Sequence, residues 1–201
     1  MPPALVIGNG ESRNDIDLNK AVADHTTIGC NALHRDYAVD HLVCCDRRMI
    51  EEAVISNNTQ QTSIWVREEW YRYFRKTRKD KRIQILPGLP YTGQNKQDKP
   101  LHWGSGPYAV LLASQLNDSI AMLGFDLYSL NGRVNNVYKG TSNYANADGH
   151  PVDYVFWVCQ IAKVFKHSPN KSFEIYNRKD WQMPKQWQYP NVSFKNIALF
   201  D

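Results

Sequence analysis

The stretch Ala4-Leu-Val-Ile-Gly-Asn-Gly-Glu-Ser12 decides the fold. Its four apolar residues predict a buried strand. Gly8 and Gly10 then allow unusual backbone angles and a close approach of the main chain to a ligand. In doubly wound α/β folds, such a strand and turn bring N–H groups to a phosphate or nucleotide. A plain β-turn explains these residues equally well, and Arg13 replaces the third glycine of the dinucleotide-binding pattern.

Length and composition describe an ordinary globular protein. The 201 residues suit one domain, so we expect residues 1–201 to form a single unit. Hydrophobic residues make up 42% of the chain, yet no apolar run approaches the ~20 residues that span a bilayer. The N-terminus has no signal-peptide pattern, and the four cysteines lack zinc-site spacing. We therefore expect a cytoplasmic protein with reduced thiols, no stable membrane anchor and no metal site.

Apolar runs alternate with helical patterns along most of the chain. This alternation predicts a Rossmann-like, mostly parallel sheet of six or seven strands with helices on both faces. Strands are expected at residues 4–7, 26–30, 41–45, 63–66, 82–86, 119–123 and 172–176. Residues 130–149 are polar and aperiodic, and loops of that length in compact domains usually serve a function. We expect this segment to be a lid loop.

Polar residues follow several of the expected strands. Ligands in parallel sheets bind beyond the carboxyl ends of the strands. The residues at these ends are Asn9, Ser12, Asn31, Asp46, Ser105, Asp126 and Tyr128. Because most of them are uncharged hydrogen-bonding groups, they favour recognition of a nucleotide through its base, hydroxyls and phosphate oxygens. Gly104-Ser105-Gly106 precedes a helix and is a second candidate anion site, although Ser105 could also simply cap that helix.

His150 closes the expected lid loop and directly precedes a helix. An imidazole facing the cleft suits general-base chemistry, although a lone histidine more often has a surface or capping role. Tyr138, Lys139 and Tyr144 in the same loop supply donors for a departing phosphate.

Eight basic residues cluster at positions 67–82 and are interleaved with the aromatic residues Trp70, Tyr71, Tyr73 and Phe74. An amphipathic helix with a solvated basic face is the plainer interpretation. The alternative is an anionic partner, either a phosphorylated glycan or, less favoured, a nucleic acid. The formal net charge of +4 is too small to identify a nucleic-acid-binding protein.

Five short motifs in order resemble the bacterial lipooligosaccharide sialyltransferase family. They are Gly8-Asn-Gly-Glu-Ser12, Cys30-Asn31, Gly104-Ser105-Gly106, Gly124-Phe-Asp126-Leu-Tyr128 and His150-Pro-Val-Asp-Tyr154. The resemblance covers residues 4–177 and extends to a wider group with pterin diphosphokinase-like and flagellin-glycosylation proteins. One departure is the tripeptide Leu101-His102-Trp103, which stands where the family has an arginine.

The resemblance implies a single Rossmann-like domain with a lid that works without a metal. Tyr128 and Tyr138 would hydrogen-bond the leaving phosphate, and His150 would take the proton of the acceptor hydroxyl. Residues implied at the nucleotide, by the resemblance or by their place at strand ends, are Gly8, Asn9, Gly10, Ser12, Asn31, Asp46, Gly104, Ser105, Gly106 and Asp126.

We therefore expect an inverting glycosyltransferase that takes a CMP-activated sugar as co-substrate and needs no other cofactor. Its acceptor would be a glycan or another, anionic, hydroxyl compound. A diphosphokinase-like phosphotransferase using ATP and Mg²⁺ is the rival enzyme. A nucleotide- or glycan-binding module that has lost turnover is the rival without catalysis. The sequence leaves the donor sugar, the linkage and a homo-oligomeric state open.

Overall fold

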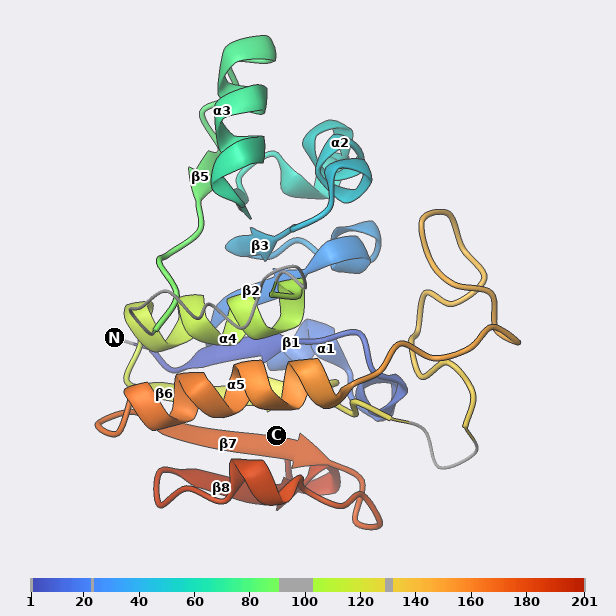
Figure 1. The fold of residues 1–201 in the computed structure, drawn as a ribbon, viewed down its shortest axis with the longest axis vertical. Helices are drawn as coiled ribbons and strands as arrows, with labels where there is room; N and C mark the ends of the chain where they lie inside the picture. The colour runs from blue at the N-terminus through green and yellow to red at the C-terminus, as the bar shows by residue number, and fades with distance from the viewer. Residues whose placement is uncertain (1, 23, 91–102, 129–131, 201) are drawn as a thin grey trace.

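The fold is an all-parallel sheet of eight strands in the order β5-β4-β3-β2-β1-β6-β7-β8 (Figure 1). The computed structural model describes residues 2–22, 24–90, 103–128 and 132–200. The strands are β1 Ala4–Ile7, β2 Thr26–Cys30, β3 His41–Val43, β4 Ser63–Val66, β5 Ile83–Ile85, β6 Ser119–Leu123, β7 Ser172–Asn177 and β8 Val192–Asn196.

The predicted α/β class and parallel sheet are confirmed, but the predicted strand count is wrong. All seven expected strands are present, although β3 and β5 are shorter than expected. The eighth, β8, pairs only with β7 at the edge of the sheet. Its central residues Ser193 and Phe194 are exposed. With no buried face of its own, β8 lacks the apolar pattern from which the other strands were predicted.

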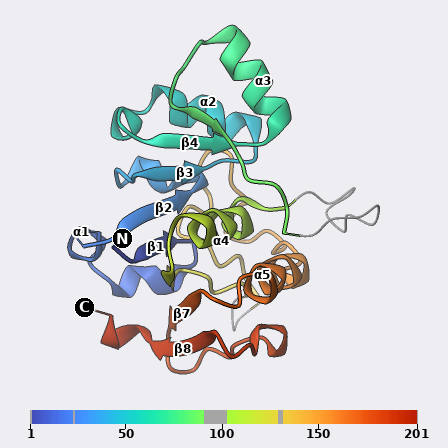
Figure 2. The same ribbon diagram turned by 90° about the vertical axis from the view of Figure 1, so that its left-hand side faces the viewer.

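Helices cover both faces of the sheet, as predicted (Figure 2). They are α1 Leu18–Ala21, α2 Arg47–Ile55, α3 Glu68–Thr77, α4 Ser105–Leu116 and α5 Val155–His167. Alternate residues of β1 point to opposite faces. Val6 packs with α4 and α5 around Val110 and Ile161, whereas Leu5 belongs to the core with α2 around Ile50. No helix in the described ranges is long and apolar enough to cross a membrane.

The turns after β1 and β6 lie against each other. Gly8 N–H donates to the Leu123 carbonyl at 2.8 Å, and Gly10 N–H donates to the Gly124 carbonyl at 2.9 Å. A Cβ atom at Gly8 would overlap the Gly124 carbonyl oxygen. Gly8 is therefore required by this close approach of two backbones. β1 and β6 are neighbours although β2 to β5 all lie on the other side of β1, so the strand order reverses here. Ligands of parallel sheets bind at such a reversal.

Candidate functional site

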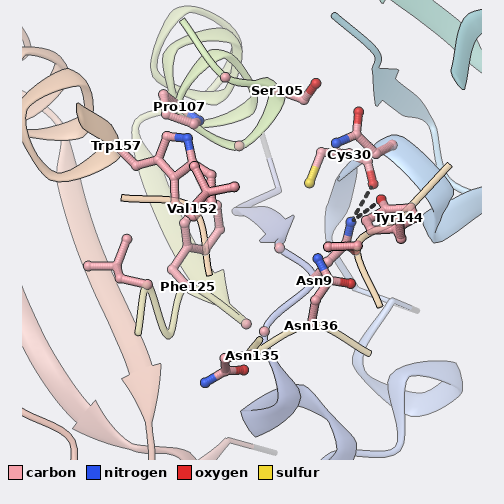
Figure 3. A pocket seen from close by; sticks show the side chains of 18 of the residues that line it. Asn9, Cys30, Ser105, Pro107, Phe125, Asn135, Asn136, Tyr144, Val152 and Trp157 are labelled. Carbon is pink, nitrogen blue, oxygen red and sulfur yellow. Dashed lines mark hydrogen bonds between the residues drawn. The ribbon is translucent and has the colours of Figure 1, made fainter. Parts of the chain in front are cut away.

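A cavity of about 480 Å³ lies beyond the carboxyl ends of β1, β2, β3, β4 and β6 (Figure 3). Nine of the thirteen residues predicted for the site line it: Gly8, Asn9, Gly10, Asn31, Asp46, Gly104, Ser105, Gly106 and His150. The parallel sheet thus gathers at one place residues that are as many as 142 positions apart in sequence. The other four, Ser12, Asp126, Tyr128 and Tyr138, are not among the lining residues within the described ranges.

Asn9 is held in place from three directions. Its side-chain N–H group donates to the Cys30 carbonyl and to the Tyr144 hydroxyl, both at 3.2 Å. Its side-chain oxygen accepts a hydrogen bond of 3.2 Å from Arg13. Arg13 is itself buried and also donates to the Gly8 carbonyl at 3.2 Å. The residue that breaks the dinucleotide-binding pattern therefore fixes the conformation of the turn after β1.

Ser12 and Asp126 form hydrogen bonds with each other beside this turn. The Ser12 N–H donates to Asp126 Oδ2 at 2.8 Å, and the Ser12 hydroxyl donates to Asp126 Oδ1. Asp126 also accepts from Asn177 at 3.2 Å, and its carbonyl accepts from the Trp181 indole at 2.9 Å. Both side chains are buried. They position the turn after β1 against the end of β6.

The hydroxyls of Tyr138 and Tyr128 are bonded to protein groups. The Tyr138 hydroxyl donates to Asp36 at 2.6 Å and accepts from Arg13 at 2.9 Å. Burial raises the pKa of Tyr138 above its usual range, so the phenol is neutral. The Tyr128 hydroxyl donates to the Gln182 carbonyl at 2.9 Å and accepts from the Gln182 N–H at 3.1 Å. Either phenol must give up these bonds before it can contact a phosphate.

Residues 132–149 lie over the cavity and contribute six lining residues: Val134, Asn135, Asn136, Asn143, Tyr144 and Ala145. The Val137 N–H donates to the Asn9 carbonyl at 2.9 Å, and Arg35 donates to the Ser142 carbonyl at 2.9 Å. The predicted lid segment therefore forms part of the cavity wall, while its role as a lid stays a prediction. Its first two residues, 130 and 131, lie outside the described ranges.

Asn31 and Ser105 present unused hydrogen-bonding capacity. Asn31 has φ 51°, a left-handed conformation that asparagine tolerates better than most residues. Its buried Oδ1 has no hydrogen-bond partner among the described residues. The Ser105 hydroxyl accepts a hydrogen bond of 3.0 Å from the Cys45 N–H, which leaves its own proton free to donate. Ser105 is not the cap residue, since Gly104 occupies that position.

Arg67 is the functional candidate that the sequence interpretation missed. It is the only Lys or Arg among the described lining residues, and it donates to the Trp103 carbonyl at 2.7 Å. Leu101 and His102 lie outside the described ranges. Arg67 directly follows β4, so the strand-end rule that selected Asn31 and Asp46 applies to it as well. The basic segment 67–82, which begins with this residue, conceals its place at a strand end.

The opposite wall of the cavity is apolar. Figure 3 shows Pro107, Phe125, Val152 and Trp157 facing the side that carries Asn9 and Tyr144. A cavity with one apolar wall and a few placed polar groups is typical of small-molecule sites. Such a wall can accept a planar base or the apolar face of a sugar ring.

Two cysteines at the cavity are buried thiols. Burial raises the pKa of Cys30 to about 12 and that of Cys45 to about 11, so both are protonated and unreactive near neutral pH. Among the described residues no three His, Cys, Asp or Glu side chains come together as metal ligands.

Comparison of the chain with protein-family models, with curated proteins and with solved structures found no match in any of the three. The resemblance to sialyltransferases therefore stays a prediction that rests on the motifs quoted above.

Proposed function

We propose that this protein binds a CMP-activated sugar in the cavity and transfers the sugar, with inversion, to an acceptor hydroxyl without a metal. The observation that supports this most is the arrangement of five separate segments, residues 8–10, 31, 46, 104–106 and 150, around one cavity. The sequence alone predicts the first four of these segments as a nucleotide site and His150 as the general base. Their backbone N–H, amide and hydroxyl groups suit a base, a ribose and a phosphate.

The phosphate of the donor would lie at the start of α4. N–H groups at the start of a helix have no partner within it and attract anions. Arg67 reaches the same place, because its guanidinium bonds the carbonyl of Trp103, next to the cap residue Gly104. A guanidinium and main-chain donors can therefore stabilise the negative charge that develops on the leaving phosphate.

The reaction is a single displacement. The acceptor oxygen forms a bond to the anomeric carbon while the bond from that carbon to the phosphate oxygen breaks, and CMP leaves with the electron pair. The exposed His150 at the cavity edge takes the acceptor proton. One displacement on one face of the sugar inverts the configuration of the anomeric carbon.

A ligand screen tests the nucleotide class. CMP, UMP, GMP, AMP and ATP are added with and without Mg²⁺, and the melting temperature is followed, because a ligand stabilises the state that it binds. CMP should give the largest shift, with or without Mg²⁺. A preference for AMP or ATP that needs Mg²⁺ would instead favour the diphosphokinase-like alternative.

A turnover assay separates enzyme from binding module. Release of CMP from CMP-sugars is measured for the wild type, for His150→Ala and for a control, His167→Ala, at the exposed far end of α5. Loss of a general base lowers turnover by about 10²–10⁴-fold. We expect that loss for His150→Ala alone. Binding of CMP without any turnover in the wild type would identify a binding module.

A further inference from the structure

Positive charge is concentrated in α3 and the turn that follows it. Residues 67–82 carry eight basic and three acidic residues, a sum of +5, whereas the whole chain has a formal net charge of +4. The remainder of the chain therefore sums to −1. Glu68 and Glu69 lie in the first turn of α3, so the excess gathers at its other end. We call the exposed residues there the basic tip: Arg75, Lys76, Arg78, Lys79 and Lys81. α3 lies at one end of the molecule in both views (Figures 1 and 2).

The acidic residues nearby are occupied by other arginines. Arg72 pairs with Glu68, and Arg82 pairs with Asp80 at 2.6 Å. In the part of the chain that the structure describes, the basic tip makes no ion pair. Arg75 donates only to the Asp80 carbonyl, at 3.4 Å. Like charges on neighbouring residues repel one another, and ion pairs among the described residues do not offset this repulsion.

Helix chemistry explains only part of the basic tip. Cations in the last turn of a helix interact favourably with its dipole, which accounts for Arg75 and Lys76. Arg78, Lys79 and Lys81 follow the end of the helix at Thr77. Lys79 has φ 53°, a conformation in which glycine is usual after a helix and a lysine is strained. A lysine at a position that favours glycine indicates that its charge is used.

Two of the aromatic residues of α3 each have a guanidinium near one face of the ring. The Arg75 guanidinium lies 5.9 Å from the centre of the Tyr71 ring, and that of Arg47 lies 5.0 Å from the centre of the Tyr73 ring. Proteins that bind single-stranded nucleic acid without sequence preference stack bases on open aromatic rings. Tyr73 remains exposed, but the basic tip itself contains no aromatic residue, so it offers charge and hydrogen-bond donors without a stacking platform of its own.

We propose that the basic tip binds an anionic polysaccharide, one that carries carboxylate, sulfate or phosphate groups along its chain. The choice of a polysaccharide rests on the proposed function, in which a glycan is the acceptor. α3 begins next to Arg67 at the cavity and ends at the basic tip, about 15 Å away at 1.5 Å per residue. An acidic glycan held at the basic tip is thereby kept close to the cavity.

The test measures binding without any donor, so its outcome does not depend on turnover. A labelled heparin fragment serves as probe, with single-stranded oligo-dT of equal charge as competitor. The variant Lys76→Glu/Lys79→Glu is compared with a control of equal net charge, Lys166→Glu/Lys179→Glu, whose lysines are exposed on α5 and after β7. Lys79→Gln/Lys81→Gln gives a milder second variant, and circular dichroism checks that every variant folds.

The logarithm of the heparin binding constant should fall linearly with the logarithm of the salt concentration, as counterion release requires. Lys76→Glu/Lys79→Glu should bind heparin about tenfold more weakly than the wild type at low salt. The control Lys166→Glu/Lys179→Glu should bind it less than about twofold more weakly. Equal losses in both variants, or binding that ignores salt, would overturn the proposal. Tighter binding of oligo-dT than of heparin would overturn the choice of a polysaccharide and favour a nucleic acid. Failure of the ligand screen with CMP would leave the heparin result standing, which separates this proposal from the proposed function.

Discussion

The side-chain amide of Asn9 donates a hydrogen bond of 3.2 Å to the hydroxyl of Tyr144, 135 positions later in the chain. The same hydroxyl accepts a hydrogen bond of 3.3 Å from the Ala32 N–H. A single phenol of the lid segment therefore holds the ends of both β1 and β2. A ligand oxygen that accepts a hydrogen bond from the Asn9 amide must therefore share this N–H group with the Tyr144 hydroxyl or displace that hydroxyl.

Removing this hydroxyl should loosen the lid. Tyr144→Phe leaves the Ala32 N–H without its acceptor, at a cost of about 1 kcal/mol in the free energy of unfolding. Hydrogen exchange of the Ala32 amide should become faster. Tyr189→Phe is the control, because the Tyr189 hydroxyl makes no hydrogen bond to the described residues. Unchanged exchange at Ala32 would show that the lid is held by its other contacts.

Asn31 and Asn9 should behave differently when they are replaced. Asn31→Gly removes an amide oxygen that has no partner among the described residues and relieves the strain of φ 51°. Stability should change little, whereas CMP affinity should fall by about 1–3 kcal/mol. Asn9→Ala should lower both the stability and the CMP affinity, because Arg13 and the Cys30 carbonyl each lose a hydrogen-bond partner. Urea unfolding measures the stability, and calorimetric titration with CMP measures the affinity. Wild-type CMP affinity in Asn31→Gly would show that Asn31 does not belong to the site.

Arg67 should matter for the phosphate and not for the base. Arg67→Gln removes a charged donor, and hydrogen bonds to charged groups contribute about 1.5–3 kcal/mol. CMP affinity should fall by that amount, while cytidine, which lacks the phosphate, should bind as to the wild type. Arg72→Gln is the control, because Arg72 lies on α3, which begins directly after Arg67, and pairs with Glu68 outside the cavity. An equal loss for CMP and cytidine would mean that Arg67 acts through Trp103 instead.

Stability should fall between pH 7 and pH 5. Burial lowers the pKa of His34 and that of His41, because it disfavours the charged imidazolium. The unfolded chain protonates these residues at about 6.5, so below that pH it binds more protons than the native state. The free energy of unfolding should therefore decrease as the pH falls through 6.5. His34→Leu should make this decrease smaller, because one of the two buried imidazoles is removed.

Urea unfolding at a series of pH values measures the effect. The exposed His167→Leu is the control and should leave the slope unchanged. The carboxyl groups of Asp15, Glu52 and Asp80 have pKa values lowered mainly by hydrogen bonds from arginines, so they act on stability only at lower pH. A slope that is the same in His34→Leu and the wild type would contradict the prediction.

Local patterns were enough to predict the sheet and most of the cavity. Strand length and apolar runs located β1 to β7, and parallel strands place their carboxyl ends at one edge, so Asn9, Asn31 and Asp46 were expected to meet. The edge strand β8 could not be predicted in this way, because it pairs with only one neighbour and packs against little of the core.

The orientation of loop side chains could not be predicted in the same way. Tyr138 turns toward Arg13 and Asp36, which are more than 100 positions away in sequence. Tyr128 bonds to Gln182, in a segment without regular structure. Arg67 is difficult to recognise in the sequence for another reason. It directly precedes a basic helix, so it reads as part of that helix and not as a residue at the end of a strand. Spacing along the chain carries no information about such long-range partners.

The central position of β1 has a consequence for synthesis on the ribosome. β1 emerges first and finds β2 soon afterwards, but its other neighbour, β6, begins only at Ser119. At typical translation rates this interval is on the order of ten seconds. Until then the backbone edge of an entirely apolar strand is open to pairing with another nascent chain. Translation arrested before Ser119 should therefore yield a product that aggregates or recruits chaperones, whereas arrest after Asn177 should yield a chain whose β1 is enclosed on both sides.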